Sequence, residues 1–267
     1  MTGWEALADE LGAWHATKQV PDFWLRDDDA VEPSPALDRL LELTGPGNVP
    51  LALAVIPAGA GEALARRLEN APWVSVLQHG YAHRNHAGAD DKKCELGSAR
   101  PAEHVIAELA VGRQSLETLF GARALPVLVP PWNRIAPHLV PMLPEIGYAG
   151  LSRFGPRERK YAVSRLAQIN THVDIIDWRG TRGFVGEEAA LGTIVAHLAA
   201  RRAGDVDAGE PTGIMTHHRD HDEACWAFLG RLLKGLEGRC TWRSADALFG
   251  EHSEDRTGSA LATGGTS

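Results

Sequence analysis

Short apolar runs alternate along the chain with longer segments in which apolar residues recur every three or four positions. The short runs predict buried strands at residues 23–26, 51–56, 74–78, 127–129, 150–152, 173–177 and 213–216. The longer segments predict helices at residues 35–44, 61–70, 102–120, 137–146, 187–202 and 223–236, after a helical N-terminus. About seven repeats of strand and helix favour parallel strands joined by crossover helices, and so an α/β barrel or a doubly wound sheet.

The C-terminal end of the chain lacks this pattern. From about Gly250 it is rich in Ser, Gly, Thr and charged residues, a composition that cannot bury a core. We therefore expect a single folded domain over residues 1–249 and a disordered tail over residues 250–267.

The composition narrows the possible partners and the compartment. The 267 residues carry a formal net charge of −8 and no basic block, which argues against nucleic acid as the main partner. No apolar run approaches the roughly 18 residues that a membrane span needs, and the acidic N-terminus lacks the features of a secretory signal. The three cysteines, Cys94, Cys225 and Cys240, lie far apart and are typical of reduced thiols. We expect a cytoplasmic protein with a small-molecule substrate, and its oligomeric state stays open.

The polar residues that could carry chemistry follow the predicted strands. In a parallel α/β fold the carboxyl ends of the strands meet on one face, where such folds hold their active sites. Five segments converge on that face, namely residues 27–29, His79 with His83, residues 130–134, Asp177, and His217 with His218.

The acids at 27–29 and the two histidines indicate a metal site. Carboxylates and imidazoles at neighbouring strand ends are the ligands of catalytic zinc-type sites. Of two adjacent carboxylates, one can bind the metal while the other stays free as a general base. The alternatives are an acidic helix cap and a pair of hydrogen-bonded loop histidines. His86 suits a substrate contact better than a fourth ligand, because a catalytic metal needs an open position.

Three further segments could complete an active site. The prolines at 130–131 fix the backbone, so that the Trp132 amide N–H could face an oxyanion. The indole of Trp132 could form an apolar wall or stack on a sugar ring. A rigid barrel loop is the alternative. Asp177 could orient a cation or a histidine, or could be a surface acid beside a core tryptophan. His217 suits a general acid that protonates a leaving nitrogen, whereas His218 is more typical of a packed histidine.

These motifs, in this order, resemble those of the polysaccharide deacetylases, the metal-dependent esterases of carbohydrate esterase family four. The resemblance rests on residues 23–30 (Phe-Trp-Leu-Arg-Asp-Asp-Asp-Ala), 79–83 (His-Gly-Tyr-Ala-His), 129–133 (Val-Pro-Pro-Trp-Asn), 177–178 (Asp-Trp) and 214–217 (Ile-Met-Thr-His). It implies a distorted (β/α) barrel of about seven parallel strands, one zinc or cobalt ion on Asp-His-His, and hydrolysis of an N-acetyl amide to an amine and acetate.

One departure from the family pattern concerns charge. Val129 stands where the family has the arginine that pairs with the catalytic Asp. Arg26 or Arg134 could supply the missing charge.

A second departure concerns register. The acids form a triplet, and Ala30 replaces the usual Gly after the Asp pair. The preferred register makes Asp28 the base and Asp29 the metal ligand. The other register gives these roles to Asp27 and Asp28.

We therefore predict a metal-dependent amide hydrolase that removes an acetyl group from an amino sugar or small glycan. Asp28 would be the base, His217 the acid and Trp132 the oxyanion donor. One divalent ion, zinc or else cobalt, would bind Asp29, His79 and His83. The expected substrate contacts are Tyr81, Trp132, Asn133, Arg134 and His86, and the residues expected to orient the catalytic groups are Arg26 and Asp177. One alternative is a non-catalytic glycan-binding or regulatory barrel, which the absence of the family's arginine at Val129 favours. The other is a hydrolase of a non-sugar C–N bond.

Overall fold

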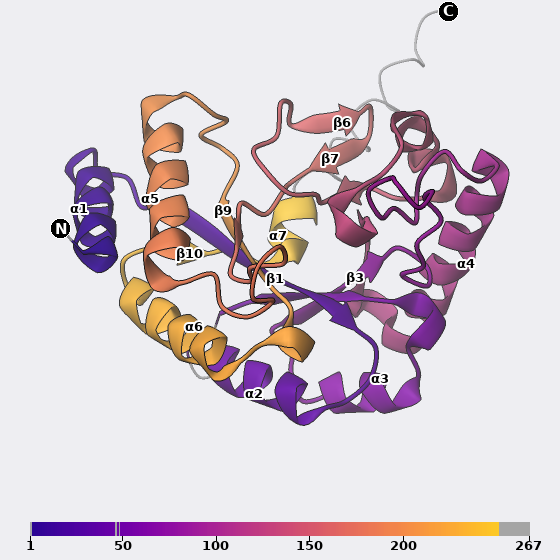
Figure 1. Ribbon diagram of the computed structural model, residues 1–267, viewed down its shortest axis with the longest axis horizontal. Coiled ribbons are helices and arrows are strands. Elements are labelled where there is room, and N and C mark those ends of the chain that lie inside the picture. Colours follow the sequence, from indigo (N-terminus) through magenta and orange to yellow (C-terminus); the bar gives the residue numbers. More distant parts are fainter. Residues whose placement is uncertain (1, 46, 48, 251–267) are drawn as a thin grey trace, which may run out of the picture.

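The computed structural model describes residues 2–45, 47 and 49–250, which form a ring of mainly parallel strands wrapped by helices (Figure 1). Neighbouring parallel strands follow the order β5 (Gly150–Leu151), β4 (Ala124–Val129), β3 (Val74–His79), β2 (Leu51–Val55), β1 (Asp22–Ala30) and β9 (Thr212–Thr216). These strands coincide with predicted apolar runs, which confirms that the runs are buried strands.

A single extended segment, residues 166–174, closes the ring. Its first part, β7 (Leu166–Gln168), pairs with β5, and its last part, β8 (Val173–Asp174), pairs with β9. Just before β8, the His172 N–H donates to the carbonyl of Gly213. The sheet is therefore a distorted barrel of about seven parallel strands, which confirms the predicted fold class.

Besides β7, two further strands and one helix were not predicted. β6 (Tyr161–Val163) forms an antiparallel hairpin with β7 outside the ring, and β10 (Thr241–Trp242) pairs with the start of β1. A short last helix, α7 (Ala245–Gly250), follows β10. Elements of this length leave too few positions for a periodic signal.

The longer helices cover the outside of the barrel. They are α1 (Gly3–Ala16), α2 (Pro35–Thr44), α3 (Glu62–Leu68), α4 (Ala102–Phe120), α5 (Glu187–Ala203) and α6 (Glu223–Leu236). The start of α2 shows why these bounds hold, because Ser34 accepts the Leu37 N–H and Pro35 occupies the first helical position.

The helix predicted at residues 137–146 is wrong in type. The chain forms two 3-10 turns there, η4 (Pro137–Met142) and η5 (Pro144–Ile146). Pro141 and Pro144 have no N–H to donate, so the regular α-helical hydrogen bonds cannot form. Other 3-10 turns are η1 (Pro57–Gly59), η2 (Gly121–Arg123), η3 (Pro131–Asn133) and η6 (His218–Asp220).

The interior of the barrel is filled at the end where the strands begin. Alternate strand residues such as Trp24, Leu77 and Val127 form one apolar cluster with α7. Phe249 of α7 meets Trp24 edge to face, with 6.3 Å between ring centroids, and Figure 1 shows α7 in the middle of the ring. The other alternate residues pack against the outer helices. The polar residues predicted to carry chemistry lie at the opposite end, where the strands finish.

No helix in the described ranges is long and apolar enough to cross a membrane. Residues 251–267 of the expected tail fall outside the described residues, so the tail stays a prediction. Gly250, which the prediction placed in the tail, is the last residue of α7.

Candidate metal and catalytic site

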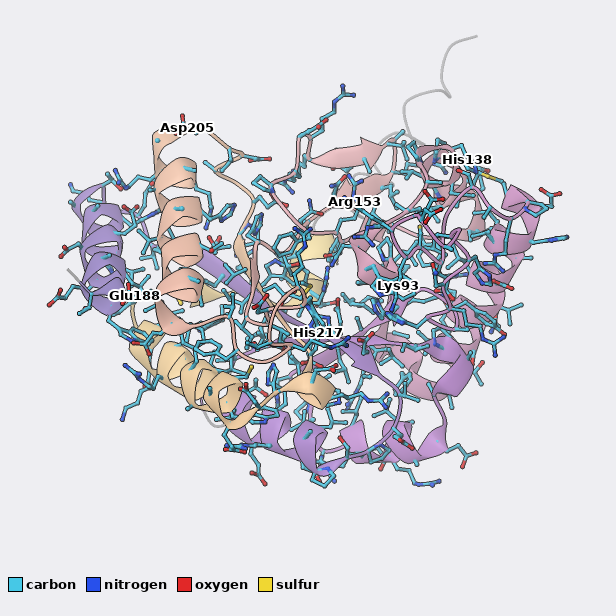
Figure 2. All side chains as sticks on the ribbon, in the orientation of Figure 1. Lys93, His138, Arg153, Glu188, Asp205 and His217 are labelled. Atoms are coloured by element: carbon cyan, nitrogen blue, oxygen red, sulfur yellow. The ribbon has the colours of Figure 1, made fainter. Side chains whose placement is uncertain are left out.

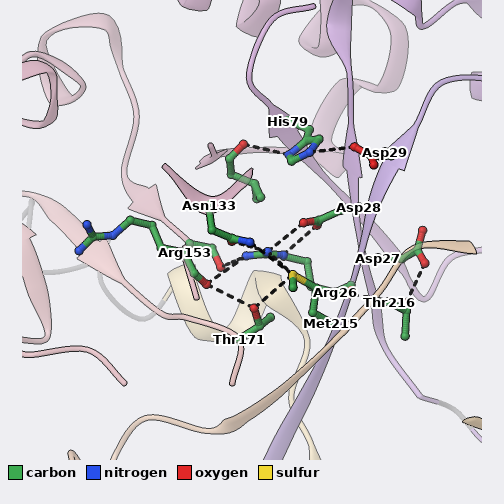
Figure 3. Close-up of polar contacts among 12 residues, drawn as sticks. Arg26, Asp27, Asp28, Asp29, His79, Asn133, Arg153, Thr171, Met215 and Thr216 are labelled. Atoms are coloured by element: carbon green, nitrogen blue, oxygen red, sulfur yellow. Dashed lines mark hydrogen bonds and ion pairs between the residues drawn. The ribbon is translucent and has the colours of Figure 1, made fainter. Parts of the chain in front are cut away.

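The three aspartates at the end of β1 turn to different partners because the strand contains an irregularity. The register between β1 and β2 shifts between Asp27 and Ala30, and Asp29 has a left-handed φ of 69°. Such a bulge re-aims side chains that strict alternation would leave on fixed faces. Figure 3 shows the result: Asp28 contacts Arg26, Asp29 contacts His79, and Asp27 turns to β9.

Asp29, His79 and His83 come together as the predicted metal-type group. Oδ1 of Asp29 lies 3.0 Å from Nε2 of His79 and 3.3 Å from Nε2 of His83. The Nδ1–H of His79 donates to the Val129 carbonyl at 3.0 Å, which leaves the Nε2 lone pair directed at Asp29. Oδ1 is itself buried and makes no well-oriented hydrogen bond. Two imidazoles and one carboxylate that converge in this way form a candidate site for a divalent cation such as zinc or cobalt.

The charges of Asp29, His79 and His83 also influence one another's pKa. Burial opposes ionisation of Asp29, but the close contact with His79 and the charge of that ring outweigh it and hold the Asp29 pKa well below its usual range. Burial likewise disfavours the protonated form of His79, yet Asp29 and Asp28 raise the His79 pKa. Burial and the neighbouring His79 lower the His83 pKa. The carboxylates therefore favour a positive charge beside His79, whereas burial and His79 disfavour one on His83.

A buried acid, Glu95, shapes the loop that carries His83. Its carboxylate accepts the N–H groups of Tyr81 and Ala82, and the side chain is 1% exposed. Gly80 has a left-handed φ of 56°, and a Cβ there would lie 2.0 Å from Oε2 of Glu95. Only glycine lets the loop approach this acid so closely. Glu95 was not predicted, because it lies in a polar loop that gives no sequence signal for burial.

Arg26 holds Asp28 in a buried, bidentate ion pair. Nε of Arg26 donates to Oδ1 at 2.8 Å, and Nη2 donates to Oδ2 at 2.9 Å. Both residues are buried. Arg26 also donates to Oγ of Ser152 and to Oδ1 of Asn133. A fork of this kind fixes the direction of a carboxylate as well as its charge environment.

Of the two arginines considered for the missing charge, Arg26 is the one that contacts the carboxylate. Arg134 instead donates to the Lys93 carbonyl at 2.8 Å. Arg26 and Asp28 are two apart on one strand, so both point into the barrel. The position of the expected arginine, Val129, contributes its carbonyl to His79.

His217 lies just after β9, near the middle of the molecule in Figure 2. Its ring meets Trp178 edge-on at 4.8 Å, and its Nδ1 is buried with no hydrogen-bond partner among the described residues. The acid coupled to it is Asp174, whose pKa burial raises and the charge of His217 pulls back. Asp177, predicted for this orienting role, instead accepts the Gly180 N–H within its own turn.

Asp174 could have been found from the sequence. It lies inside the predicted strand 173–177, between the apolar residues Val173 and Ile175, where a carboxylate is unexpected unless a site uses it. Its Oδ2 accepts the indole N–H of Trp178 at 2.8 Å. The pair Asp174 and Trp178 therefore borders His217 on one side.

Asp27 ties β1 to the turn that carries His217. Its Oδ2 accepts from Oγ1 of Thr216 at 2.7 Å and from the His218 N–H at 2.9 Å, while its Oδ1 contacts Nδ1 of His218. Asp27 and His218 are 0% and 1% exposed. His218 is therefore packed against a buried acid, as the sequence suggested.

The remaining predicted contacts lie on the loops after β3 and β4. The Trp132 ring lies 4.4 Å from that of His83, and Asn133 bonds Arg26, so both border the site. Trp132 has a left-handed φ of 54°. Tyr81 and His86 are half-buried on the β3 loop. A substrate contact by Tyr81, His86 or Arg134 stays a prediction.

A second buried group, His172, His197 and Glu210, also has the composition of a metal site. Nδ1 of His172 accepts the Gly213 N–H at 3.0 Å, so Nε2 carries the ring proton. That Nε2 lies 3.3 Å from Oε2 of Glu210. Because the nitrogen that would bind an ion is protonated, this group suits a packed polar cluster rather than a metal.

Comparison with known proteins places this geometry in context. No family model matches the sequence, and no curated protein matches it. Among solved structures, a putative polysaccharide deacetylase from Mycobacterium smegmatis superposes with a TM-score of 0.60 at 16% identity, covering 89% of this chain and 92% of its own. The chain has the polysaccharide deacetylase fold. A family 4 carbohydrate esterase from Streptomyces lividans in complex with acetate gives a TM-score of 0.53 at 17% identity, covering 83% and 91%.

A third neighbour with the deacetylase fold contains a metal. It is a family 4 acetyl xylan esterase from Clostridium thermocellum in complex with a cobalt ion, with a TM-score of 0.51 at 16% identity, covering 86% of this chain and 91% of its own. These superpositions establish the deacetylase fold. Because the sequence identities are low, the reaction must be argued from the side chains of this chain.

Proposed function

We propose that this protein is a metal-dependent amide hydrolase that removes the N-acetyl group of an amino sugar or small glycan. The observation that carries the proposal is the division between two adjacent carboxylates. Asp29 turns to His79 and His83, whereas Asp28 is held by Arg26 at a separate position. One carboxylate is thus free to ligate an ion and the other to take a proton.

A divalent ion held by Asp29, His79 and His83 would supply an acidified water and would polarise the amide carbonyl. Asp28 accepts the proton of the attacking water as the new bond to the carbonyl carbon forms. The Trp132 N–H donates to the carbonyl oxygen as negative charge develops on it. His217 gives a proton to the nitrogen as the C–N bond breaks, so that the free amine and acetate leave.

The competing hypotheses draw less support from the site. A non-catalytic barrel was favoured by the missing arginine at Val129, but the ion pair between Arg26 and Asp28 supplies that charge. A non-sugar substrate has no specific feature in its favour. Trp132 beside His83 and Trp178, which is 37% exposed, offer flat apolar surfaces of the kind that stack on sugar rings.

Metal analysis followed by acetate release tests this function. Purified protein is loaded with zinc or cobalt, its metal content is measured, and acetate is assayed across a panel of N-acetylated amino sugars. We expect one equivalent of metal and measurable release. Fully loaded protein that releases no acetate from any member of the panel would refute the proposal.

A further inference from the structure

A cavity of about 530 Å³ lies beside the catalytic residues, at the ends of β4, β5 and β7. This volume is within the range of small-molecule sites. Its lining includes Asn133, Arg153, Phe154, Glu158, Arg159 and Gln168. Asn133 belongs to both places, because its Oδ1 accepts from the arginine that holds Asp28. A molecule whose amide lies at Asp28 can therefore extend over Asn133 into the cavity.

Arg153 contributes an unneutralised positive charge to this cavity. Its backbone carbonyl accepts from Nη1 of Arg26, and Figure 3 shows its side chain running the other way. Nη2 of Arg153 donates to Oε1 of Gln168 at 3.3 Å, which is a neutral acceptor. No carboxylate among the described residues pairs with Arg153.

The neighbouring sequence adds to this charge. Residues 153–160 contain four basic residues and one acid, Glu158, in a chain whose net charge is −8. Arg157 is buried and paired with Asp207. Arg159 is exposed and has no acceptor among the described residues. A local positive field in an acidic protein raises the local concentration of anions.

Phe154 adds an apolar face to the same cavity. It is 47% exposed, one of only a few large apolar side chains in the described ranges that reach solvent to this extent. An exposed aromatic ring beside polar groups is suited to stack on a sugar ring. The cavity therefore combines a stacking surface with two cations, Arg153 and Arg159, and one acid, Glu158, which leaves an excess of positive charge.

We propose that this cavity binds an anionic group, a phosphate or a carboxylate, carried by the N-acylated amino sugar, through Arg153 and Arg159. The proposal rests on the proposed function and narrows its substrate class. Guanidinium groups pair with phosphate and carboxylate oxygens through charge-assisted, often bidentate hydrogen bonds. The anion anchors the substrate while its amide lies at Asp28.

The test compares anionic and neutral substrates of one sugar. The values of kcat/KM are measured for N-acetylglucosamine, N-acetylglucosamine 6-phosphate and N-acetylmuramic acid, which carry no charge, a phosphate and a carboxylate. We expect the wild type to prefer at least one anionic sugar by about tenfold or more, mainly through KM. Arg159→Gln should lower that ratio about tenfold, and the double variant Arg153→Gln/Arg159→Gln should lower it further.

Arg179→Gln is the matched control, because Arg179 is an exposed arginine that does not line the cavity. It should leave the anionic-to-neutral ratio within about twofold, since an exposed charge that does not contact the anion is screened by solvent and salt. The proposal is overturned if the wild type treats the three sugars alike, or if Arg179→Gln lowers the ratio as much as Arg159→Gln does. Whichever sugar is preferred identifies the anion as phosphate or carboxylate.

A binding measurement separates this proposal from the proposed function. Calorimetric titration of the wild type and of Arg159→Gln with N-acetylglucosamine 6-phosphate requires no turnover. Binding that Arg159→Gln weakens, without acetate release, supports the cavity and overturns the hydrolase. Turnover of neutral sugars without any preference for anionic ones supports the hydrolase and overturns the anion-binding cavity.

Discussion

Two groups of histidines and carboxylates in this barrel have nearly the same composition and opposite surroundings. The mouth group is Asp29, His79 and His83, at the end of the barrel where the strands finish, and the wall group is His172, His197 and Glu210. In the mouth group, His79 donates its Nδ1–H to a carbonyl and points Nε2 at Asp29. In the wall, His172 accepts an N–H at Nδ1, so its Nε2 carries a proton toward Glu210. Only the first arrangement leaves a lone pair for a metal ion. The hydrogen bond on the far nitrogen of each histidine therefore decides which group can bind metal.

The charges around the two groups differ as well. Asp29, within the mouth group, and Asp28, beside it, raise the pKa of His79 against the effect of burial. In the wall, burial, His172 and Arg201 lower the pKa of His197 to about 3. The mouth therefore favours an added positive charge, whereas the surroundings of His197 in the wall oppose one on that ring. A divalent cation is therefore expected at the mouth alone.

Removing the histidines at the mouth should have the largest effect. His79→Ala/His83→Ala should carry no stoichiometric metal and should lose turnover to background, because two of three ligands are gone. The metal content is measured by elemental analysis and the activity by acetate release.

The matched variant is His172→Ala/His197→Ala, which should be less stable yet should keep the full metal content of the wild type. If it loses an equivalent of metal that the mouth variant keeps, the assignments of the two groups are reversed.

The second prediction separates the carboxylates beside the mouth. Asp28→Asn should retain metal and lose about 10²- to 10⁴-fold in kcat, because Asn cannot take a proton from water. Asp27→Asn should instead lower the free energy of unfolding, since it removes the buried partner of His218. Urea unfolding, metal content and kcat are measured for both variants. Asp27→Asn with wild-type stability and the larger loss of kcat would favour the other register of the triplet.

How far the sequence predicts this site depends on the range of each interaction. Local patterns predicted β1 to β5, β8 and β9 and placed His79 and His83 at the end of one of these strands, because alternation and loop position are set by neighbouring residues. The prolines at 141 and 144 also carried a readable signal against an α-helix. The contact of Arg26 with Ser152 joins residues 126 positions apart. The sequence could therefore name Arg26 as one of two candidates, but only the closed barrel selects it.

The bulge at the end of β1 and the tautomer of His172 were beyond prediction for the same reason. The direction of Asp29 depends on a register shift against β2, and the proton on His172 depends on the Gly213 N–H, 41 positions away. Neither residue type nor spacing encodes these partners. Residue composition alone would predict that both histidine groups bind a metal ion.

The third prediction uses pH to test the neutral state of the wall group. His197 has a folded pKa of about 3, below its ordinary value of 6.5, because burial and the charges of His172 and Arg201 oppose its protonation. The unfolded chain therefore binds a proton first, so the contribution of His197 to stability is present above pH 6.5 and is lost as pH falls toward 3. Between these values one such group adds a slope of about 1.4 kcal/mol per pH unit.

Urea unfolding between pH 4 and 7, with metal removed by a chelator, measures this slope. His197→Phe keeps an aromatic ring against His172 and should flatten the slope by about that amount. His104→Phe, on the exposed side of α4, should leave it unchanged. Equal slopes for the wild type and His197→Phe would mean that His197 is protonated in the folded barrel.

The smallest expected effect tests the tautomer of His172 directly. The amide oxygen of Asn can occupy the place of Nδ1, whereas the amide of Gln reaches the place of Nε2. Because the Gly213 N–H needs an acceptor at the Nδ1 position, His172→Asn should be more stable than His172→Gln by about 1 kcal/mol, the net value of one hydrogen bond. The two free energies of unfolding are compared in metal-free protein at neutral pH. If Nε2 of His172 were instead a metal ligand, the ring proton would lie on Nδ1 and the order of the two stabilities would be reversed. Added zinc would then stabilise the wild type but not His172→Gln.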